Sequence, residues 1–110
     1  MSFITVAELA LWRQGGFDFQ LLDVRRAQAR IDHGSDIPGG VWRDPAQWLD
    51  WKNDVGNQRP VVVYCAHGHE ISQGLTAALR AMGIDARHLD GGISAWTAAG
   101  HAVVPAEACR

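Results

Sequence analysis

The feature that most constrains the fold is residues 61–64, four β-prone apolar residues that run directly into Cys65. The run Val-Val-Val-Tyr does not alternate with polar residues, which is typical of a strand buried on both faces of a parallel sheet. After a short loop, apolar side chains recur three and four residues apart, which predicts a helix with one buried face. The positions of this stripe are Ile71, Leu75, Ala78, Leu79 and Met82. Cys65 is therefore expected where a buried strand ends and a helix is about to begin.

This position favours a reactive thiol at Cys65. The start of a helix offers N–H groups without partners and the positive end of the helix dipole, and both stabilise a thiolate. Gly68 allows the loop to curl tightly, and His67 and His69 make its surroundings polar. The alternative is an inert cysteine packed as a small apolar side chain, which is common at the end of a buried strand. We expect the reactive thiol.

Length and composition restrict the class of protein. A chain of 110 residues forms one domain, residues 1–110, that can bury a core without disulfides or metals. The formal net charge of −2 gives no sign of a nucleic-acid partner. No signal peptide is visible, and the apolar runs are too short for a membrane span. Cys65 and Cys109 are too few for a disulfide framework. We expect a cytoplasmic location, which keeps Cys65 as a free thiol.

Short strands and helices are predicted to alternate along the chain. The strands are expected at 3–4, 20–24, 41–42, 61–64 and 86–89. Thr5 and Glu8 form a capping box for the first helix, and Asp44 followed by a proline starts another. This second helix is expected to pack through Trp48, Leu49 and Trp51. The pattern predicts an α/β fold: a three-layer sandwich with a central, mainly parallel five-stranded sheet flanked by helices.

Three loops are expected at one rim of this sheet. Ligands of parallel sheets bind beyond the carboxyl ends of the strands. Residues 23–25, 65–70 and 90–92 all lie at the carboxyl ends of predicted strands. The rim is therefore the candidate site.

The order of these segments resembles a single-domain rhodanese, of the thiosulfate sulfurtransferase-like family. The matching stretches are residues 21–25, 36–40, 65–70 and 89–96. The resemblance implies that Cys65 takes a sulfane sulfur from a donor such as thiosulfate or a persulfide. The resulting persulfide passes the sulfur to a thiophilic acceptor such as cyanide or a thiol, without a cofactor. The six-residue loop resembles the sulfur-handling form, and not the longer loop of related phosphatases.

The site residues follow from the resemblance and from the loop chemistry. Cys65 is the expected nucleophile, and the substrate-binding residues are Ala66, His67, Gly68, His69, Glu70 and Ile71. The backbone amides of residues 67–71 are expected to form a nest for the persulfide anion. The residues expected to support the pocket are Asp23, Arg25, Gly91 and Gly92. Asp23 and Arg25 are expected to form a buried ion pair or loop-fixing hydrogen bonds in preference to a catalytic pair.

Two departures from the family pattern concern the donor. Glu70 stands where many family members carry arginine, and a carboxylate facing the pocket would repel thiosulfate. We therefore expect a persulfide or a protein-bound sulfur to be a better donor. The segment between Asp23 and Ile37 is slightly longer than the common form and lacks a glutamate often found there.

Several alternatives stay open. Cys65, His67 and His69 could bind zinc with His33 or His88 as a fourth ligand, but residues on one tight loop rarely close a tetrahedral site, so no metal is expected.

The second candidate function is a catalytically weak binding or sensing module. The expected partners are a small-molecule donor and acceptor, or a protein persulfide, with no nucleic acid or membrane, and the chain is expected to be a monomer or weak dimer. Two interpretations are open for the tryptophans and for the last cysteine. Trp42, Trp48 and Trp51 either pack on the sheet or form a protein-binding patch, and Trp96 belongs either to the core or to the pocket wall. Cys109 is either a resolving thiol or has no role.

Overall fold

A five-stranded parallel sheet is the centre of the molecule in the computed structural model, which describes residues 2–106. The strand order is β1-β6-β5-β2-β4, and every neighbouring pair is parallel. The strands are β1 (Phe3–Ile4), β2 (Gln20–Asp23), β4 (Val41–Trp42), β5 (Val61–Tyr64) and β6 (Ala86–Leu89). The uninterrupted apolar run of β5 therefore lies in the middle of the sheet, as predicted.

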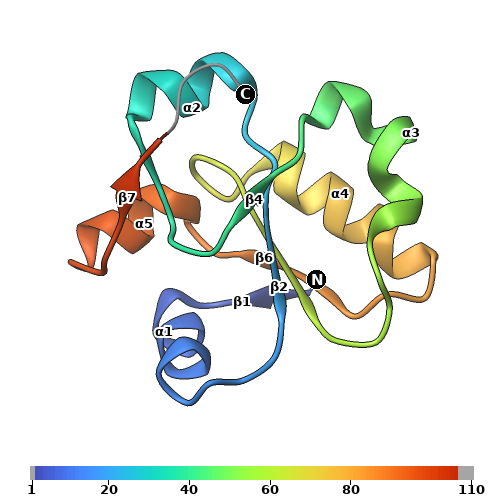
Figure 1. Ribbon diagram of the computed structural model, residues 1–110, viewed down its shortest axis with the longest axis horizontal. Coiled ribbons are helices and arrows are strands. Elements are labelled where there is room, and N and C mark those ends of the chain that lie inside the picture. The colour runs from blue at the N-terminus through green and yellow to red at the C-terminus, as the bar shows by residue number, and fades with distance from the viewer. Residues whose placement is uncertain (1, 107–110) are drawn as a thin grey trace.

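Helices cover both faces of this sheet. The helices are α1 (Val6–Gln14), α2 (Ala27–His33), α3 (Trp48–Trp51), α4 (Glu70–Ala81) and α5 (Gly92–Ala98), with 3₁₀ turns η1 (Pro45–Gln47) and η2 (Lys52–Asp54). In Figure 1, α1 and α5 lie to one side of the sheet and α3 and α4 to the other, while α2 lies beyond the carboxyl ends of the strands. The predicted three-layer sandwich is confirmed.

Two apolar cores, one on each side of the sheet, hold the layers together. Successive residues of a strand point to opposite faces, so Val62 belongs to the core with α1 and α5, and Val63 to the core with α3 and α4. Leu21 and Leu22 of β2 divide in the same way. Cys65 continues this alternation and joins the second core. The sheet thereby places the sulfur on the side of α4.

The buried face of α4 differs from the predicted stripe. Its buried residues are Ser72, Thr76 and Leu79, and the predicted Ile71, Leu75 and Ala78 are half-buried. Met82 is exposed, so this prediction was wrong. The reason is that Met82 is the C-cap, where the backbone leaves the helical path. The buried face of α4 therefore carries two polar residues, Ser72, which contacts Cys65, and Thr76.

The segment after Asp44 also folds differently from the prediction. Asp44 caps a short 3₁₀ turn, with its Oδ1 accepting from the Ala46 amide at 3.0 Å. In the single turn of α3, Trp48 and Trp51 lie three residues apart and share the inward face. Leu49 faces away and is 76% exposed, so its predicted packing role was wrong.

A small antiparallel ribbon was not predicted. It joins β3 (Ser35–Asp36) to β7 (Val104–Pro105), two segments far apart in the sequence. The amide of Ala106 extends the pairing by donating to the Gly34 carbonyl at 3.0 Å. Cys109 lies outside the described residues, so the two interpretations of it, a resolving thiol or no role, both stay untested. None of the helices within residues 2–106 has the length and apolar composition needed to cross a bilayer.

Candidate active site

The sulfur of Cys65 lies at the end of β5, next to the first turn of α4. The side chain is buried, with 6% of the residue exposed. The amide of Gly68 donates to Sγ at 3.2 Å, and the hydroxyl of Ser72 lies 3.1 Å from it. The Ser72 hydroxyl is also 3.4 Å from the carbonyl oxygen of His69, to which it donates. The cysteine therefore has two polar contacts at the start of a helix, where the predicted strand–loop–helix junction placed it.

The amide nest predicted from residues 67–71 is only partly formed around Sγ. Within the described chain, Gly68 is the residue whose backbone amide donates to this sulfur. The first amides of α4 have no partner inside the helix. In a persulfide the outer sulfur would lie about 2 Å beyond Sγ. That these further amides receive the outer sulfur stays a prediction.

Backbone amides in the first turn of α5 donate hydrogen bonds to the Cys65 loop. The amide of Ile93 donates to the carbonyl of Cys65 at 3.0 Å, and the amide of Ser94 donates to the carbonyl of Ala66 at 3.0 Å. The side-chain amide of Gln73 adds a third tie, to the carbonyl of Gly68 at 2.8 Å. The loop is thus fixed to two helices, which keeps the sulfur in place.

Glycines are required where these segments meet. Gly68 and Gly92 have φ angles of +75° and +61°, which L side chains rarely adopt. A Cβ on Gly92 would lie 2.4 Å from the carbonyl oxygen of Cys65, and one on Gly68 would lie 2.7 Å from the amide nitrogen of Gly91. The prediction that Gly91 and Gly92 form a tight turn close to the Cys65 loop agrees with this geometry.

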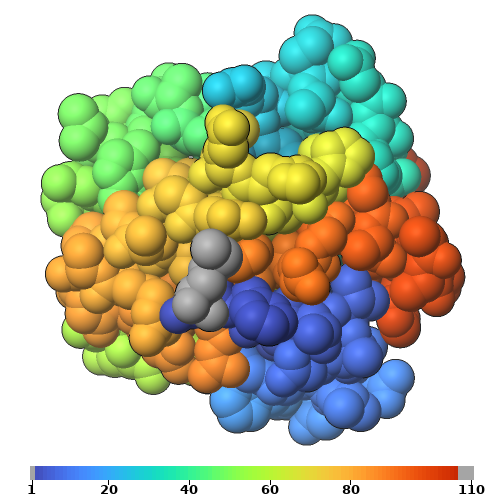
Figure 2. Space-filling view, turned by 180° about the vertical axis from the view of Figure 1, so that it is seen from behind, coloured from blue at the N-terminus to red at the C-terminus, as the bar shows by residue number. Residues whose placement is uncertain are grey.

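A pocket of about 350 Å³ opens above the sulfur. It is lined by Arg25, Arg26, Ala29, Cys65, Ala66, His67, His69, Glu70 and Ile71. Figure 2 shows the segment between β5 and α4, in yellow, reaching the surface between the cyan region of α2 and the orange-red region of α5. Of the predicted substrate-binding residues, only Gly68 does not line the pocket, because it is buried and acts through its amide.

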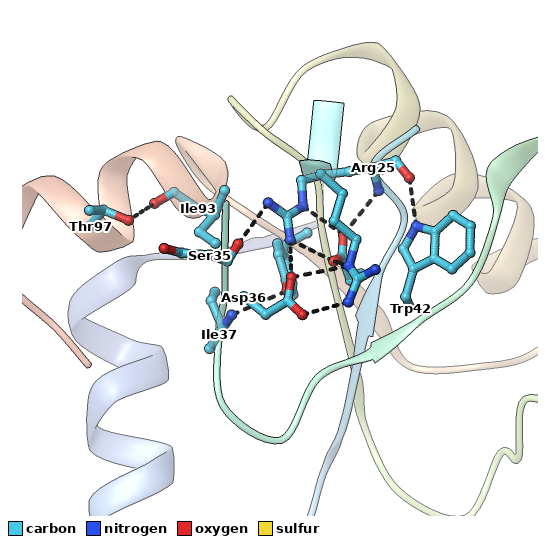
Figure 3. A network of polar contacts seen from close by, with 10 residues as sticks. Arg25, Ser35, Asp36, Ile37, Trp42, Ile93 and Thr97 are labelled. Atoms are coloured by element: carbon cyan, nitrogen blue, oxygen red, sulfur yellow. Dashed lines mark hydrogen bonds and ion pairs between the residues drawn. The ribbon is translucent and has the colours of Figure 1, made fainter. Parts of the chain in front are cut away.

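Asp23 and Arg25 support the pocket from within. The guanidinium of Arg25 binds both carboxylate oxygens of Asp23, at 2.9 and 2.8 Å, and Oδ1 of Asp36 at 2.6 Å. Arg30 binds Asp36 at 2.8 Å and lies 3.7 Å from Asp23. Figure 3 shows this network, in which the indole of Trp42 donates to the Arg25 carbonyl at 2.8 Å. The buried ion pair predicted for Asp23 and Arg25 is present, and Asp36 and Arg30 extend it to a network of four charges.

The four charges of this network compensate one another. Burial by itself would lower the pKa of Arg25, but the hydrogen bond and charge of Asp23 outweigh it and raise the pKa above its ordinary value. A hydrogen bond to Asp36 raises the pKa of Arg30. Burial also raises the pKa of Tyr64, which lies under the Arg25 guanidinium, 5.4 Å from the ring centre. Since two cations face two anions, Arg25 forms part of the pocket wall without adding a free positive charge.

The other sequence candidates do not line the pocket. Residues 2–106 contain no group of three or more His, Cys, Asp or Glu side chains that could hold a metal ion. His88 is buried in β6 and contacts the carbonyl oxygen of Ser2 at 3.0 Å. Trp96 is core and not pocket wall, with its indole donating to the Ala102 carbonyl at 2.8 Å. Trp51 is buried, and Trp48 packs against it edge-on.

Sequence reasoning missed Arg26, Ala29 and Ser72. Arg26 and Ala29 line the pocket because α2 begins directly beyond the carboxyl end of β2. Ser72 had a readable signal, since Ser72, Thr76 and Leu79 follow helical spacing on one face. A polar residue on the inner face, one turn after a cysteine loop, indicates a contact with that loop.

Comparison with protein families settles the classification. The family model described as Rhodanese-like domain matches residues 5–99. The chain is a rhodanese-like domain. A comparison with curated protein sequences found no match.

Solved structures agree with this family. The rhodanese-like domain is similar to a rhodanese-related protein from Thermoplasma volcanium, with a TM-score of 0.81 and 23% identity over 94% of this chain and 98% of that one. It is also similar to a rhodanese-like domain protein from Staphylococcus aureus, with a TM-score of 0.79 and 27% identity over 97% and 100% of the two chains. A thiosulfate sulfurtransferase from Pseudomonas aeruginosa matches at a TM-score of 0.79 and 27% identity, over 97% of this chain but 20% of that one.

Proposed function

We propose that this rhodanese-like domain is a sulfurtransferase that carries sulfane sulfur as a persulfide on Cys65. The observation that carries the proposal is the buried sulfur at the floor of a pocket, in contact with the Gly68 amide and the Ser72 hydroxyl. Hydrogen-bond donors at a helix start favour a thiolate and the anionic sulfur that replaces it. Similarity to a thiosulfate sulfurtransferase supports the same chemistry.

The reaction has two steps. In the first, the Cys65 thiolate attacks the outer sulfur of the donor, an S–S bond forms on Cys65, and the donor's own S–S bond breaks. With thiosulfate the leaving group is sulfite, which takes the electron pair of the broken bond. In the second, a nucleophile such as cyanide attacks the outer sulfur, and Cys65 leaves as the thiolate. The covalent cysteine divides the transfer into two easier displacements, and no cofactor is needed.

Ser72 acts as a positioning residue for the sulfur. Its hydroxyl lies between Sγ of Cys65 and the carbonyl of His69, at 3.1 and 3.4 Å. With a thiol at Cys65 the hydroxyl can donate to the His69 carbonyl, and with a thiolate it can rotate and donate to the sulfur. The hydroxyl can therefore change its hydrogen-bond acceptor as the charge on the sulfur changes during each step.

Glu70 lowers the rate with thiosulfate. Its carboxylate lines the pocket and is exposed, so the dielectric around it is close to that of water. At about 6 Å, a dianion would be repelled by about 1.4 kcal/mol, which corresponds to about a tenfold effect on rate. Glu70→Gln should raise kcat/KM for thiosulfate by up to about tenfold at low salt, and less at high salt. Asp18→Asn, at the opposite end of the sheet, is the control. An unchanged rate in Glu70→Gln at low salt would contradict this role.

The second candidate is a binding or sensing module with negligible turnover. The exposed Glu70 beside the nucleophile is the observation that favours it. The partners of the proposed enzyme are a small sulfur donor and acceptor, or a protein persulfide. A reducing cytoplasm would keep Cys65 as a thiol, and we place the reaction there.

Thiocyanate formation tests the proposal. Wild-type protein with cyanide and a donor, thiosulfate or an organic persulfide, should form thiocyanate catalytically. Cys65→Ser should fall to the rate without protein, and Cys109→Ser, the matched cysteine control, should remain close to wild type. Equal rates in wild type and Cys65→Ser would remove Cys65 from the mechanism, and negligible turnover with every donor would favour the binding module.

A further inference from the structure

We propose that the acceptor of this domain is a small thiol that carries both an ammonium and a carboxylate group. The inference rests on the proposed sulfur transfer and names the substrate class for its second step. It is based on two opposite charges, Arg26 and Glu70, which line the same pocket as Cys65.

Among residues 2–106, these two charges have no protein partner. Arg26 precedes α2 and Glu70 is the first residue of α4, so different elements bring them to the pocket. Both are exposed, and within residues 2–106 neither side chain forms a hydrogen bond or an ion pair, with each other or with another residue. Arg25, the other cation of the lining, is bound to Asp23 and Asp36. As far as the described residues show, the pocket lining thus offers one unpaired positive and one unpaired negative charge, Arg26 and Glu70.

This charge pattern selects among acceptors. A thiol with a carboxylate alone gains from Arg26 and loses at Glu70, and one with an ammonium alone has the reverse balance. A thiol that bears both groups is attracted by both residues. The pocket volume of about 350 Å³ is at the small end of the ligand-pocket range of about 300–1,000 Å³, which suits a molecule of amino-acid size.

The transfer step is balanced without another reactant. The acceptor thiolate attacks the outer sulfur of the Cys65 persulfide, forming a new S–S bond in the acceptor. The S–S bond to Cys65 breaks, and its electron pair returns to Cys65 as the thiolate. The product is the acceptor's persulfide.

The test separates loading from acceptance. Cys65 is first converted to the persulfide with excess donor, which is then removed, and loss of the persulfide is followed after mixing with one thiol. The four thiols are L-cysteine with both charges, cysteamine with the ammonium, 3-mercaptopropionate with the carboxylate, and mercaptoethanol with neither. They are compared at equal thiolate concentration and at about pH 8.

L-cysteine should react fastest. Exposed ion pairs correspond to about a two- to fivefold gain each, so the rate should exceed that of mercaptoethanol by about four- to twenty-five-fold at low salt. The preference should largely disappear at about 1 M salt, where the screening length is about 3 Å. Glu70→Gln should remove the gain from the ammonium, and Arg26→Gln the gain from the carboxylate. The control variants Asp18→Asn and Arg59→Gln, at the amino-terminal end of the sheet, should keep the wild-type preference.

A second measurement does not depend on turnover. S-methyl-L-cysteine has both charges but no free thiol, and it should slow the alkylation of Cys65 by iodoacetamide in wild type and less in either pocket variant. Equal rates for the four thiols, or a preference unchanged in Glu70→Gln and Arg26→Gln, would overturn the inference. Failure to load Cys65 would instead refute the proposed function, and the protection experiment would still decide whether the pocket binds such a molecule.

Discussion

Gly92→Ala is expected to destabilise the domain far more than a glycine-to-alanine change at a comparable backbone angle elsewhere. A Cβ at position 92 would lie 2.4 Å from the carbonyl oxygen of Cys65 and 2.6 Å from that of Ala66. Both atoms belong to the backbone, so relief requires the loop and α5 to separate. That movement would weaken the bonds from the amides of Ile93 and Ser94 to these two carbonyls.

The expected magnitude follows from two contributions. Holding alanine at a φ of +61° costs about 1–2 kcal/mol, and loss of two hydrogen bonds adds about 1 kcal/mol each. Gly92→Ala should therefore reduce the free energy of unfolding by about 3–4 kcal/mol. At an m-value of about 1.5 kcal/mol/M, the urea midpoint should fall by about 2–2.7 M.

Two other glycines serve as matched controls. Gly16 has a φ of +68° and no atom within 4 Å of its added Cβ, so Gly16→Ala measures the backbone strain alone, about 1–2 kcal/mol. Gly74 lies inside α4 with open space around it, and Gly74→Ala should stabilise by about 0.5–1 kcal/mol. If Gly92→Ala cost no more than Gly16→Ala in urea unfolding, the close approach of α5 to the Cys65 loop would be refuted.

Three further variants test other parts of the structure. Ser72→Ala should slow sulfur loading of Cys65 by about tenfold, because it removes a hydrogen bond to charged sulfur that contributes about 1.5 kcal/mol. Thr76→Ala, one turn further along α4, should not slow loading, because the Thr76 hydroxyl has no partner among the described residues. Equal rates in the two variants would contradict the positioning role. Arg25→Gln should lower the free energy of unfolding by about 3–5 kcal/mol in urea, because it removes the bidentate partner of buried Asp23 and leaves two carboxylates with Arg30 as their one remaining cation in the network; a loss below 1 kcal/mol would argue against the network. Because burial raises the pKa of Tyr64, the folded state retains the phenol proton that the unfolded chain releases near pH 10, so stability is full below pH 10 and falls above it. At pH 11 the wild type should have lost about 1.4 kcal/mol that Tyr64→Phe does not lose, and parallel pH profiles would refute the assignment.

The arrangement of the site was predictable because its determinants are local. An apolar run without polar alternation is typical of a strand buried on both faces, so residues 61–64 indicated that Cys65 lies at the centre of the rim. Gly68, Gly91 and Gly92 are required by backbone geometry that no other residue adopts easily. The pairing of Asp23 with Arg25 involves residues two apart at a strand end.

The parts that could not be predicted depend on tertiary contacts. The β3–β7 ribbon has two residues in each strand, too few for a periodic signal, and it joins remote segments. Arg30 and Asp36 complete the charge network only because α2 folds back over the end of β2. Arg26 reaches the pocket for the same reason. Whether Glu70 faces the pocket was also open from the sequence, since an exposed residue at a helix start can point in several directions.

The most direct test of the central claim is the mass of the protein after treatment with a sulfur donor. Wild-type protein exposed to an organic persulfide and freed of excess reagent should gain the mass of one sulfur atom. Peptide mapping should place that sulfur on Cys65, and cyanide should remove it with release of one thiocyanate per adduct. Cys65→Ser should gain no sulfur that cyanide can release at this site. A wild-type protein that gains none, or an adduct that is equally abundant in Cys65→Ser, would contradict the claim that Cys65 carries the transferred sulfur.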